Sequence, residues 1–233
     1  MPQPYRAIFF DLDGTLLDLI ACERETVRRL LAQTYPSFGR AETDHFLSAY
    51  AQISPGQWAV GLAAGSTREE IVTAILSAVC AQRDMDVSGL SHSIALYWQL
   101  FADIAVLEEG ARETLESLSA QYRLGLISNG YPDTQRPRLG AAGLLHYFET
   151  IVVSGEVGWA KPDPRIFAHA LGQMEIAPGD ALYVGDSTSH DLAGALNARL
   201  DFCLYRPTGH GGLSLPPGVR LVTALSQLAA LLA

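Results

Sequence analysis

The feature of the sequence that most limits its fold is the regular alternation of short apolar runs with helical stretches that begins at Glu108. Four such runs follow it: Leu124–Ile127, Ile151–Val153, Leu182–Val184 and Phe202–Leu204. Strands that alternate with helices form right-handed βαβ units and a parallel sheet. Ala7–Phe10 is a fifth apolar run, too short to show a helical period, and we expect it to rejoin this sheet as a buried strand.

The region between the first strand and Glu108 has a different pattern. Apolar residues recur there at helical spacing, as in Val27, Leu30 and Leu31, and Ser54-Pro55-Gly56 is a turn signal expected to separate two helices. We therefore predict an α/β protein whose Rossmann-like core, residues 1–15 and 108–233, carries an inserted all-helical cap, residues 16–107.

Charge and composition restrict the partners. The formal net charge of −9 over 233 residues disfavours a nucleic acid polymer, whose phosphates need a basic surface. Three isolated cysteines form neither a disulfide framework nor a zinc site, and the N-terminus lacks a signal-peptide pattern. No apolar stretch is long enough for a membrane span. We expect a cytoplasmic monomer or homodimer that acts on a small metabolite and does not bind membranes.

Polar segments follow the predicted strands at their carboxyl ends. They are Asp11-Leu12-Asp13-Gly14-Thr15, Ser128-Asn129-Gly130, Lys161-Pro162, and Gly185-Asp186 with Asp191. Open parallel sheets bind their ligands at this edge. Each segment alone is weak evidence, but four in order, each after its own strand, indicate an active site.

The acids of these segments suggest phosphoryl transfer. A carboxylate on Asp11, held at the end of a buried strand, can attack phosphorus and form an acyl phosphate. Asp13 can protonate the leaving oxygen and then deprotonate the attacking water. Asp11, Asp186 and Asp191 could not share a pocket unpaired, because like charges raise each other's pKa, and Mg²⁺ would resolve this with oxygen ligands.

The remaining segments offer groups for the phosphate. Ser128, Asn129 and the neighbouring backbone amides can hold phosphate oxygens, and Lys161 can supply positive charge to the transferring group. Lys161 is the single lysine beside fifteen arginines, which suggests a position that requires a compact point charge, although chance survival on the surface would also leave one lysine. Structural interpretations of these residues also remain open. Ser128 could cap a helix, and Asp191 could lie in the first turn of a helix, where the dipole favours an acid. His190 is more typical of an exposed helix residue than of a ligand.

The segments DLDGT, ISNG, KPDP and GDSTSHD resemble the four signature motifs of the haloacid dehalogenase superfamily. The resemblance spans residues 5–15 and about 108–206, and the insertion resembles the superfamily's C1-type cap. It implies that Asp11 is the nucleophile, that Asp13 is the general acid/base and a metal ligand through its carbonyl, and that Asp186 and Asp191 lie at the magnesium. It also implies that Ser128 and Lys161 bind phosphate. Dehalogenases of the superfamily lack an acid at the position of Asp13, so the resemblance implies a phosphatase.

One subgroup is more similar still over LISNGYPDTQRPRL and FETIVVSGEVGWAKPDPRIF. It contains pyrimidine 5'-nucleotidases and N-acylneuraminate-9-phosphatase-like enzymes, which implies a small phosphorylated substrate such as a nucleoside 5'-monophosphate. Two alternatives remain at this point: a sugar phosphomutase on the same core, and a binding or regulatory descendant without catalysis. Whether Asp191 ligates the metal or orients Lys161 is also open.

Overall fold

The computed structural model describes residues 5–83, 85, 90–209 and 211–232. The chain divides into two compact units, Met1–Leu19 with Ala105–Ala233, and Ile20–Ile104. Within the described residues, no helix combines the length and the apolar character needed to cross a membrane.

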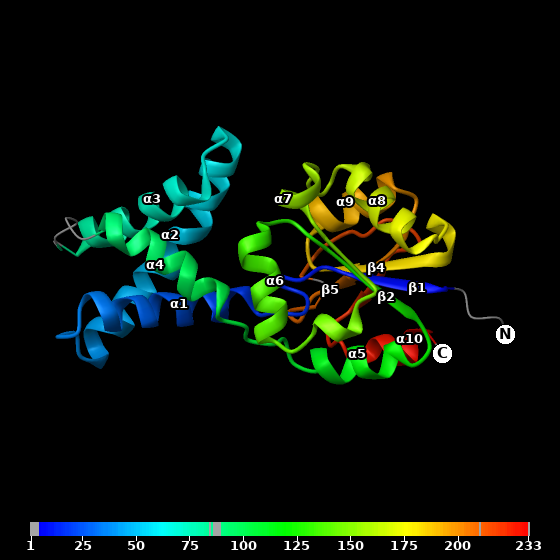
Figure 1. The fold of residues 1–233 in the computed structure, drawn as a ribbon, viewed down its shortest axis with the longest axis horizontal. Coiled ribbons are helices and arrows are strands. Elements are labelled where there is room, and N and C mark those ends of the chain that lie inside the picture. Colours follow the sequence, from blue (N-terminus) through cyan, green and yellow to red (C-terminus); the bar gives the residue numbers. More distant parts are fainter. Residues whose placement is uncertain (1–4, 84, 86–89, 210, 233) are drawn as a thin grey trace. The chain divides into compact units, whose positions relative to one another are not determined.

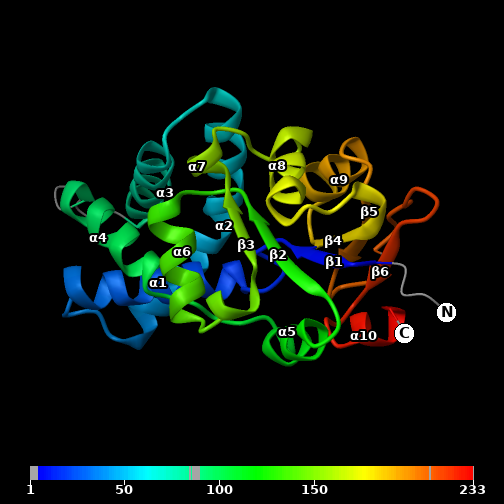
Figure 2. The same cartoon turned by 45° about the vertical axis from the view of Figure 1, so that its right-hand side comes forward.

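The first unit is built on a six-stranded sheet with the strand order β3-β2-β1-β4-β5-β6. Every pairing between neighbouring strands is parallel, and Figure 2 shows β3, β2 and β1 side by side. The strands are β1 Ala7–Phe10, β2 Arg123–Ser128, β3 Thr150–Val153, β4 Ala181–Gly185, β5 Asp201–Tyr205 and β6 Arg220–Val222. The predicted α/β fold with a parallel sheet is confirmed.

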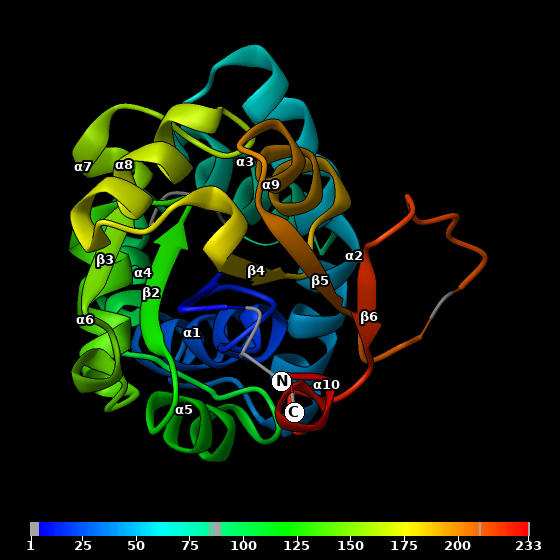
Figure 3. The same ribbon diagram turned by 90° about the vertical axis from the view of Figure 1, so that its right-hand side faces the viewer.

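Helices cover both faces of this sheet. Figure 3 shows α8 and α9 on one side and α5 and α10 on the other. The helices of the unit are α5 Ala111–Ser119, α6 Pro132–Ala141, α7 Ser154–Val157, α8 Pro164–Met174, α9 Ala193–Asn197 and α10 Gln227–Leu232, with short turns at Leu145–Tyr147, Pro178–Asp180 and Thr188–Leu192. The last of these turns has π-helical spacing and leads directly into α9.

A large buried apolar cluster lies between the sheet and α8. Asp163 caps α8 by accepting a hydrogen bond from the Arg165 amide, and Pro164 occupies the first helical position, where no amide hydrogen is needed. The buried side chains of α8 pack with residues of β1 and β4 such as Phe9 and Tyr183, neither of which is exposed to solvent. This packing fixes the strands whose carboxyl ends carry the candidate site.

Among its described residues, the second unit has four helices, drawn in blue to green in Figure 1: α1 Leu19–Thr34, α2 Arg40–Ala64, α3 Arg68–Gln82 and α4 Leu90–Ala102. Gly65, with a left-handed φ of 72°, ends α2, and Thr67 with Glu70 forms a capping box that begins α3. The helices bury the apolar faces expected from the sequence, among them Val27, Leu30 and Leu31.

The expected turn at Ser54-Pro55-Gly56 is wrong, because α2 continues through Pro55 to Ala64. A proline inside a helix removes one backbone hydrogen bond and crowds the preceding turn. Packing of the second half of α2 offsets this cost: a Cβ on Gly61 would lie 2.4 Å from a side-chain carbon of Ile71 in α3, so the two helices approach closely.

Candidate active site

Asp11 is the first residue after β1 and stands at the carboxyl edge of the sheet. The β1 residues are all buried, and the Asp11 amide donates to the Val184 carbonyl at 2.9 Å, which continues the alignment of β1 with β4. Asp11 as a whole is only 7% exposed. The chain then turns away through Gly14, whose φ of 80° suits glycine and whose missing side chain leaves room for Asp186.

Lys161 lies beside Asp11 and is only 4% exposed. Its Nζ lies 2.6 Å from Asp11 Oδ1, 2.7 Å from Asp191 Oδ1 and 3.0 Å from the Tyr183 hydroxyl. Its three N–H donors therefore meet three oxygens, as a buried ammonium requires.

Asn129 holds the backbone of Lys161 from both sides. The Lys161 amide donates to Asn129 Oδ1 at 2.7 Å, and Asn129 Nδ2 donates to the Lys161 carbonyl at 2.9 Å. The side chain of Asn129 thus joins the segment after β2 to the lysine, whose peptide bond with Pro162 is cis.

Asp191 reaches the same point from the π-helical turn after β4. It has no exposure, and its Oδ2 accepts a hydrogen bond from the Ser187 amide at 2.9 Å. Gly185 is required here because a Cβ would lie 2.5 Å from that oxygen. Both oxygens of Asp191 therefore have partners within the protein.

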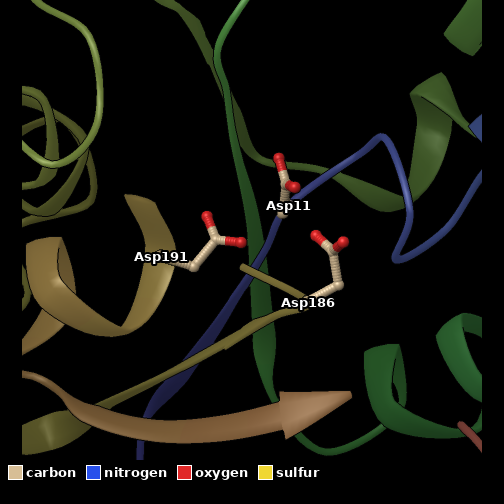
Figure 4. A group of neighbouring side chains, drawn as sticks. All are labelled: Asp11, Asp186 and Asp191. Atoms are coloured by element: carbon tan, nitrogen blue, oxygen red, sulfur yellow. The ribbon is translucent and has the colours of Figure 1, made fainter. Parts of the chain in front are cut away.

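Asp11, Asp186 and Asp191 form a cluster in which one oxygen from each carboxylate lies within 4.8 Å of the others. Figure 4 shows the three side chains converging from the end of β1, the end of β4 and the following turn. Three carboxylates around one ammonium leave excess negative charge. An oxygen-only donor set of this kind fits a hard divalent cation such as Mg²⁺.

The electrostatics of the cluster reflect this excess. Burial raises the pKa of Asp11 well above its usual value, the neighbouring carboxylates add to the rise, and Lys161 opposes it. Desolvation of its carboxylate and then the charge of Asp191 raise the pKa of Asp186 to about 6, although part of the residue is exposed to solvent. Burial lowers the pKa of Lys161, but the charges of Asp11 and Asp191 outweigh burial, so its pKa rises overall and the ammonium stays charged.

Asp13 lies outside this cluster and is held by α6. Its Oδ1 is 2.7 Å from Nη2 of Arg138, and its Oδ2 accepts a hydrogen bond from Gln135 Nε2 at 2.7 Å. The same Gln135 nitrogen donates to Ser128 Oγ at 2.7 Å. Ser128 is buried at the end of β2 and is connected to the site through Gln135.

A cavity of about 280 Å³ opens over these groups, and its lining comprises Asp11, Asp13, Asn129, Lys161, Asp186, Ser187, His190 and Asp191. A larger hollow of about 510 Å³ lies at the other end of β1 and β2, lined by Tyr5, Arg6 and residues 119–123. No carboxylate of a described residue lines that hollow, so the smaller cavity is the candidate active site.

The structure thus brings Asp11, Asp13, Asn129, Lys161, Asp186 and Asp191 to one cavity, and it leaves Ser128 just behind them. Three residues at the site, Tyr183, Gln135 and Arg138, were not predicted from the sequence, and a fourth, His190, was interpreted there as an exposed helix residue. In the sequence, Tyr183 looks like an ordinary buried strand residue, and Gln135 and Arg138 look like polar residues on a surface helix. His190, next to Asp191, lines the cavity.

Comparison with known proteins identifies the family. Haloacid dehalogenase-like hydrolases match residues 5–199. This chain belongs to that family. It is 29% identical over 238 residues to the N-acylneuraminate-9-phosphatase of Rattus norvegicus, covering 97% of this chain and 93% of the relative. It is 28% identical over 208 residues to pyrimidine 5'-nucleotidase PynA of Streptococcus pneumoniae, covering 87% of this chain and 84% of the relative.

A solved structure supports the same family assignment. The HAD-hydrolase YfnB of Bacillus subtilis, described as bound to magnesium, superposes with a TM-score of 0.84 at 27% identity and covers 98% of both chains. With relatives named for phosphatase and nucleotidase activity, this family member is a phosphatase-type hydrolase. The expected resemblance to the superfamily and to these two kinds of enzyme is confirmed.

Proposed function

We propose that this chain hydrolyses a phosphomonoester in two steps, with the phosphoryl group carried on Asp11 between them. The observation that carries the proposal is the charge arrangement: three converging carboxylates, a single buried ammonium between two of them, and a cavity of about 280 Å³ over the group. Such a site is negative until a cation binds, and with the cation it can accept a phosphate dianion.

In the first step, a carboxylate oxygen of Asp11 attacks phosphorus, and the bond between phosphorus and the leaving oxygen breaks. Asp13 gives its proton to the leaving oxygen, so the alcohol departs neutral. Lys161, held at 2.6 Å from Asp11 Oδ1, offsets the charge that spreads over the phosphoryl oxygens. Ser128 and the backbone of the segment at Asn129 hold those oxygens from the side of β2.

In the second step, water attacks phosphorus and Asp13 takes its proton, which regenerates Asp11 and frees inorganic phosphate. Mg²⁺, held by Asp11, Asp186, Asp191 and the Asp13 carbonyl, would screen the nucleophile from the phosphate and stabilise the charge that develops on it. The solved relative described as bound to magnesium supports this choice of metal.

The substrate class is the finer part of the proposal. We favour nucleoside 5'-monophosphates, supported by the nucleotidase relative, which matches 87% of this chain. A phosphorylated sugar acid is the second candidate, supported by the phosphatase relative that matches 97%. We assign specificity to the inserted helices, residues 16–107, as a cap, and hydrolysis is favoured over phosphomutase activity because the relatives bear the names of hydrolases.

A magnesium-dependent assay of Asp11→Asn tests the mechanism. The variant keeps the shape of Asp11 but lacks the nucleophile, so phosphate release from p-nitrophenyl phosphate should disappear while thermal unfolding stays cooperative. EDTA should silence the wild type and Mg²⁺ should restore it. Asp44→Asn, an identical change at an exposed position in α2, is the matched control and should be fully active. Turnover by Asp11→Asn, or activity that survives chelation, would reject the proposal.

A substrate panel tests the class. Nucleoside monophosphates, sugar phosphates and a sugar-acid phosphate are compared by kcat/KM with phosphate detection. A clear preference for any sugar phosphate over every nucleotide would remove the nucleotidase assignment. Interconversion of sugar phosphates with little phosphate release would instead indicate a mutase.

A further inference from the structure

Arg138 is an unusual residue for a surface helix such as α6, because its side chain has no exposure to solvent. A buried guanidinium is costly unless it is paired and hydrogen-bonded. Arg138 Nη2 forms an ion pair with Asp13 Oδ1 at 2.7 Å, without the alignment of a hydrogen bond, and Nη1 donates to Gln135 Oε1 at 3.2 Å. The buried charge is thus directed at Asp13 and at the residue one helical turn before it.

Gln135 contacts the other carboxylate oxygen of Asp13. Its Nε2 donates to Asp13 Oδ2 and to Ser128 Oγ, each at 2.7 Å, while its Oε1 accepts from Arg138. Both hydrogens of the amide and its oxygen are therefore used, which fixes the orientation of the group. Gly130, at a φ of 154°, packs against it so closely that a Cβ would lie 2.9 Å from the Gln135 amide carbon.

We propose that Arg138 and Gln135 are positioning residues for Asp13, and that they set the orientation from which it transfers the proton. This rests on the proposed role of Asp13 as general acid/base. One contact falls on each carboxylate oxygen, and since a carboxylate has about four acceptor sites, room remains for the transferred proton. Because Gln135 also contacts Ser128, the orientation of Asp13 is tied to a residue assigned to the phosphate.

The inference predicts a dependence on the leaving group. Proton donation matters for an alkyl phosphate and little for p-nitrophenyl phosphate, whose leaving group needs no proton. Arg138→Met and Gln135→Met should lower kcat/KM for an alkyl phosphate on the order of 10–10²-fold, with a much smaller loss of kcat/KM for p-nitrophenyl phosphate. The comparison uses kcat/KM because it reports the phosphorylation step, whereas kcat also includes hydrolysis of the phosphorylated enzyme, which both substrates share. Arg138→Lys should recover part of the alkyl phosphatase activity.

A double-mutant cycle separates positioning from general damage. In the Asp13→Asn background, Arg138→Met should cause no further loss of alkyl over nitrophenyl selectivity, because the group it positions is already disabled. Arg112→Met is the matched control: Arg112 donates to the carbonyls of Ala142 and Gly143, away from the site, and its loss should slow neither substrate selectively.

Equal slowing of both substrates by Arg138→Met and Gln135→Met would overturn the inference, and so would a selective loss that persists in the Asp13→Asn background. If Arg138→Met does not fold, Gln135→Met alone decides. When Asp13→Asn itself shows no dependence on the leaving group, the acid/base assignment fails and the inference fails with it. When Asp13→Asn shows the dependence and both methionine variants lack it, only the positioning role is rejected.

Discussion

Replacing Lys161 with arginine keeps the positive charge but changes its shape, and we expect it to disable the enzyme. The Lys161 Nζ meets oxygens of Asp11, Asp191 and Tyr183 at 2.6, 2.7 and 3.0 Å in a position with 4% exposure. A lysine directs three donors from one point, whereas a guanidinium is planar, longer and spreads its donors in a fork. The fork cannot occupy this point without displacing a carboxylate.

The expected losses of stability and rate follow from the burial of Lys161. Overfilling a packed interior costs about 1–3 kcal/mol of stability. For a chain of this size each kcal/mol lowers Tm by roughly 2–4 °C. A displacement of about 1 Å at a reacting group costs on the order of 10² in rate, so kcat for p-nitrophenyl phosphate should fall at least that far.

Steady-state kinetics with Mg²⁺ and thermal unfolding provide the assay, and Lys161→Met serves as the control for charge. Both variants should be nearly inactive if shape and charge are both required. If charge alone were needed, the arginine variant would work and only the methionine variant would fail. An arginine variant with kcat within about threefold of wild type would therefore refute the argument from shape.

Three further outcomes are expected. Gly14→Ala should weaken magnesium activation, because its Cβ would lie 2.6 Å from Asp186 Oδ2 at a φ of 80°; an unchanged magnesium titration would contradict this. Without divalent cations, Asp186→Asn should raise Tm above pH 6 but not below pH 3.8. The pKa of Asp186 is raised from 3.8 to about 6 in the folded protein, so the wild type loses stability as pH rises through that interval and the carboxylate ionises, whereas the neutral asparagine variant does not. Equal shifts at both ends of the interval would be the contrary result. Asp13→Asn should release a burst of about one nitrophenolate per enzyme and then stall with phosphorylated Asp11, visible by mass spectrometry; steady turnover without a burst would oppose the acid/base role.

The fold was largely predictable because apolar runs and helical spacing report burial directly. The strands from Ala7–Phe10 to Phe202–Leu204 all lie in the observed sheet. The turn predicted at Pro55 was wrong, because tertiary packing overrides the local preference of proline and α2 continues through it. The sixth strand, Arg220–Val222, was missed because it is three residues long and only one of them is fully buried.

The candidate site was predictable to the extent that it follows the strands. Residues at the carboxyl ends of β1, β2 and β4 must meet at one edge of a parallel sheet, so Asp11, Ser128 and Asp186 could be grouped without coordinates. Arg138 could not be grouped with them. Nothing in the pattern of α6 says which of its polar residues turns inward, and its burial depends on contacts with Asp13 from a segment far away in the sequence.

The charge balance of the site argues that the acids serve chemistry and not folding. Buried ion pairs are often matched or exceeded in stability by apolar residues of similar volume, by about 1–4 kcal/mol. Here the balance is less favourable still, since one ammonium faces three carboxylates and the pKa values of Asp11 and Asp186 are raised. A descendant that only bound a partner would be more stable with fewer acids. Keeping Asp11, Asp186 and Asp191 around a single Lys161 is useful to a chain that binds a cation and then a phosphate, which is the arrangement a phosphoryl-transfer enzyme requires.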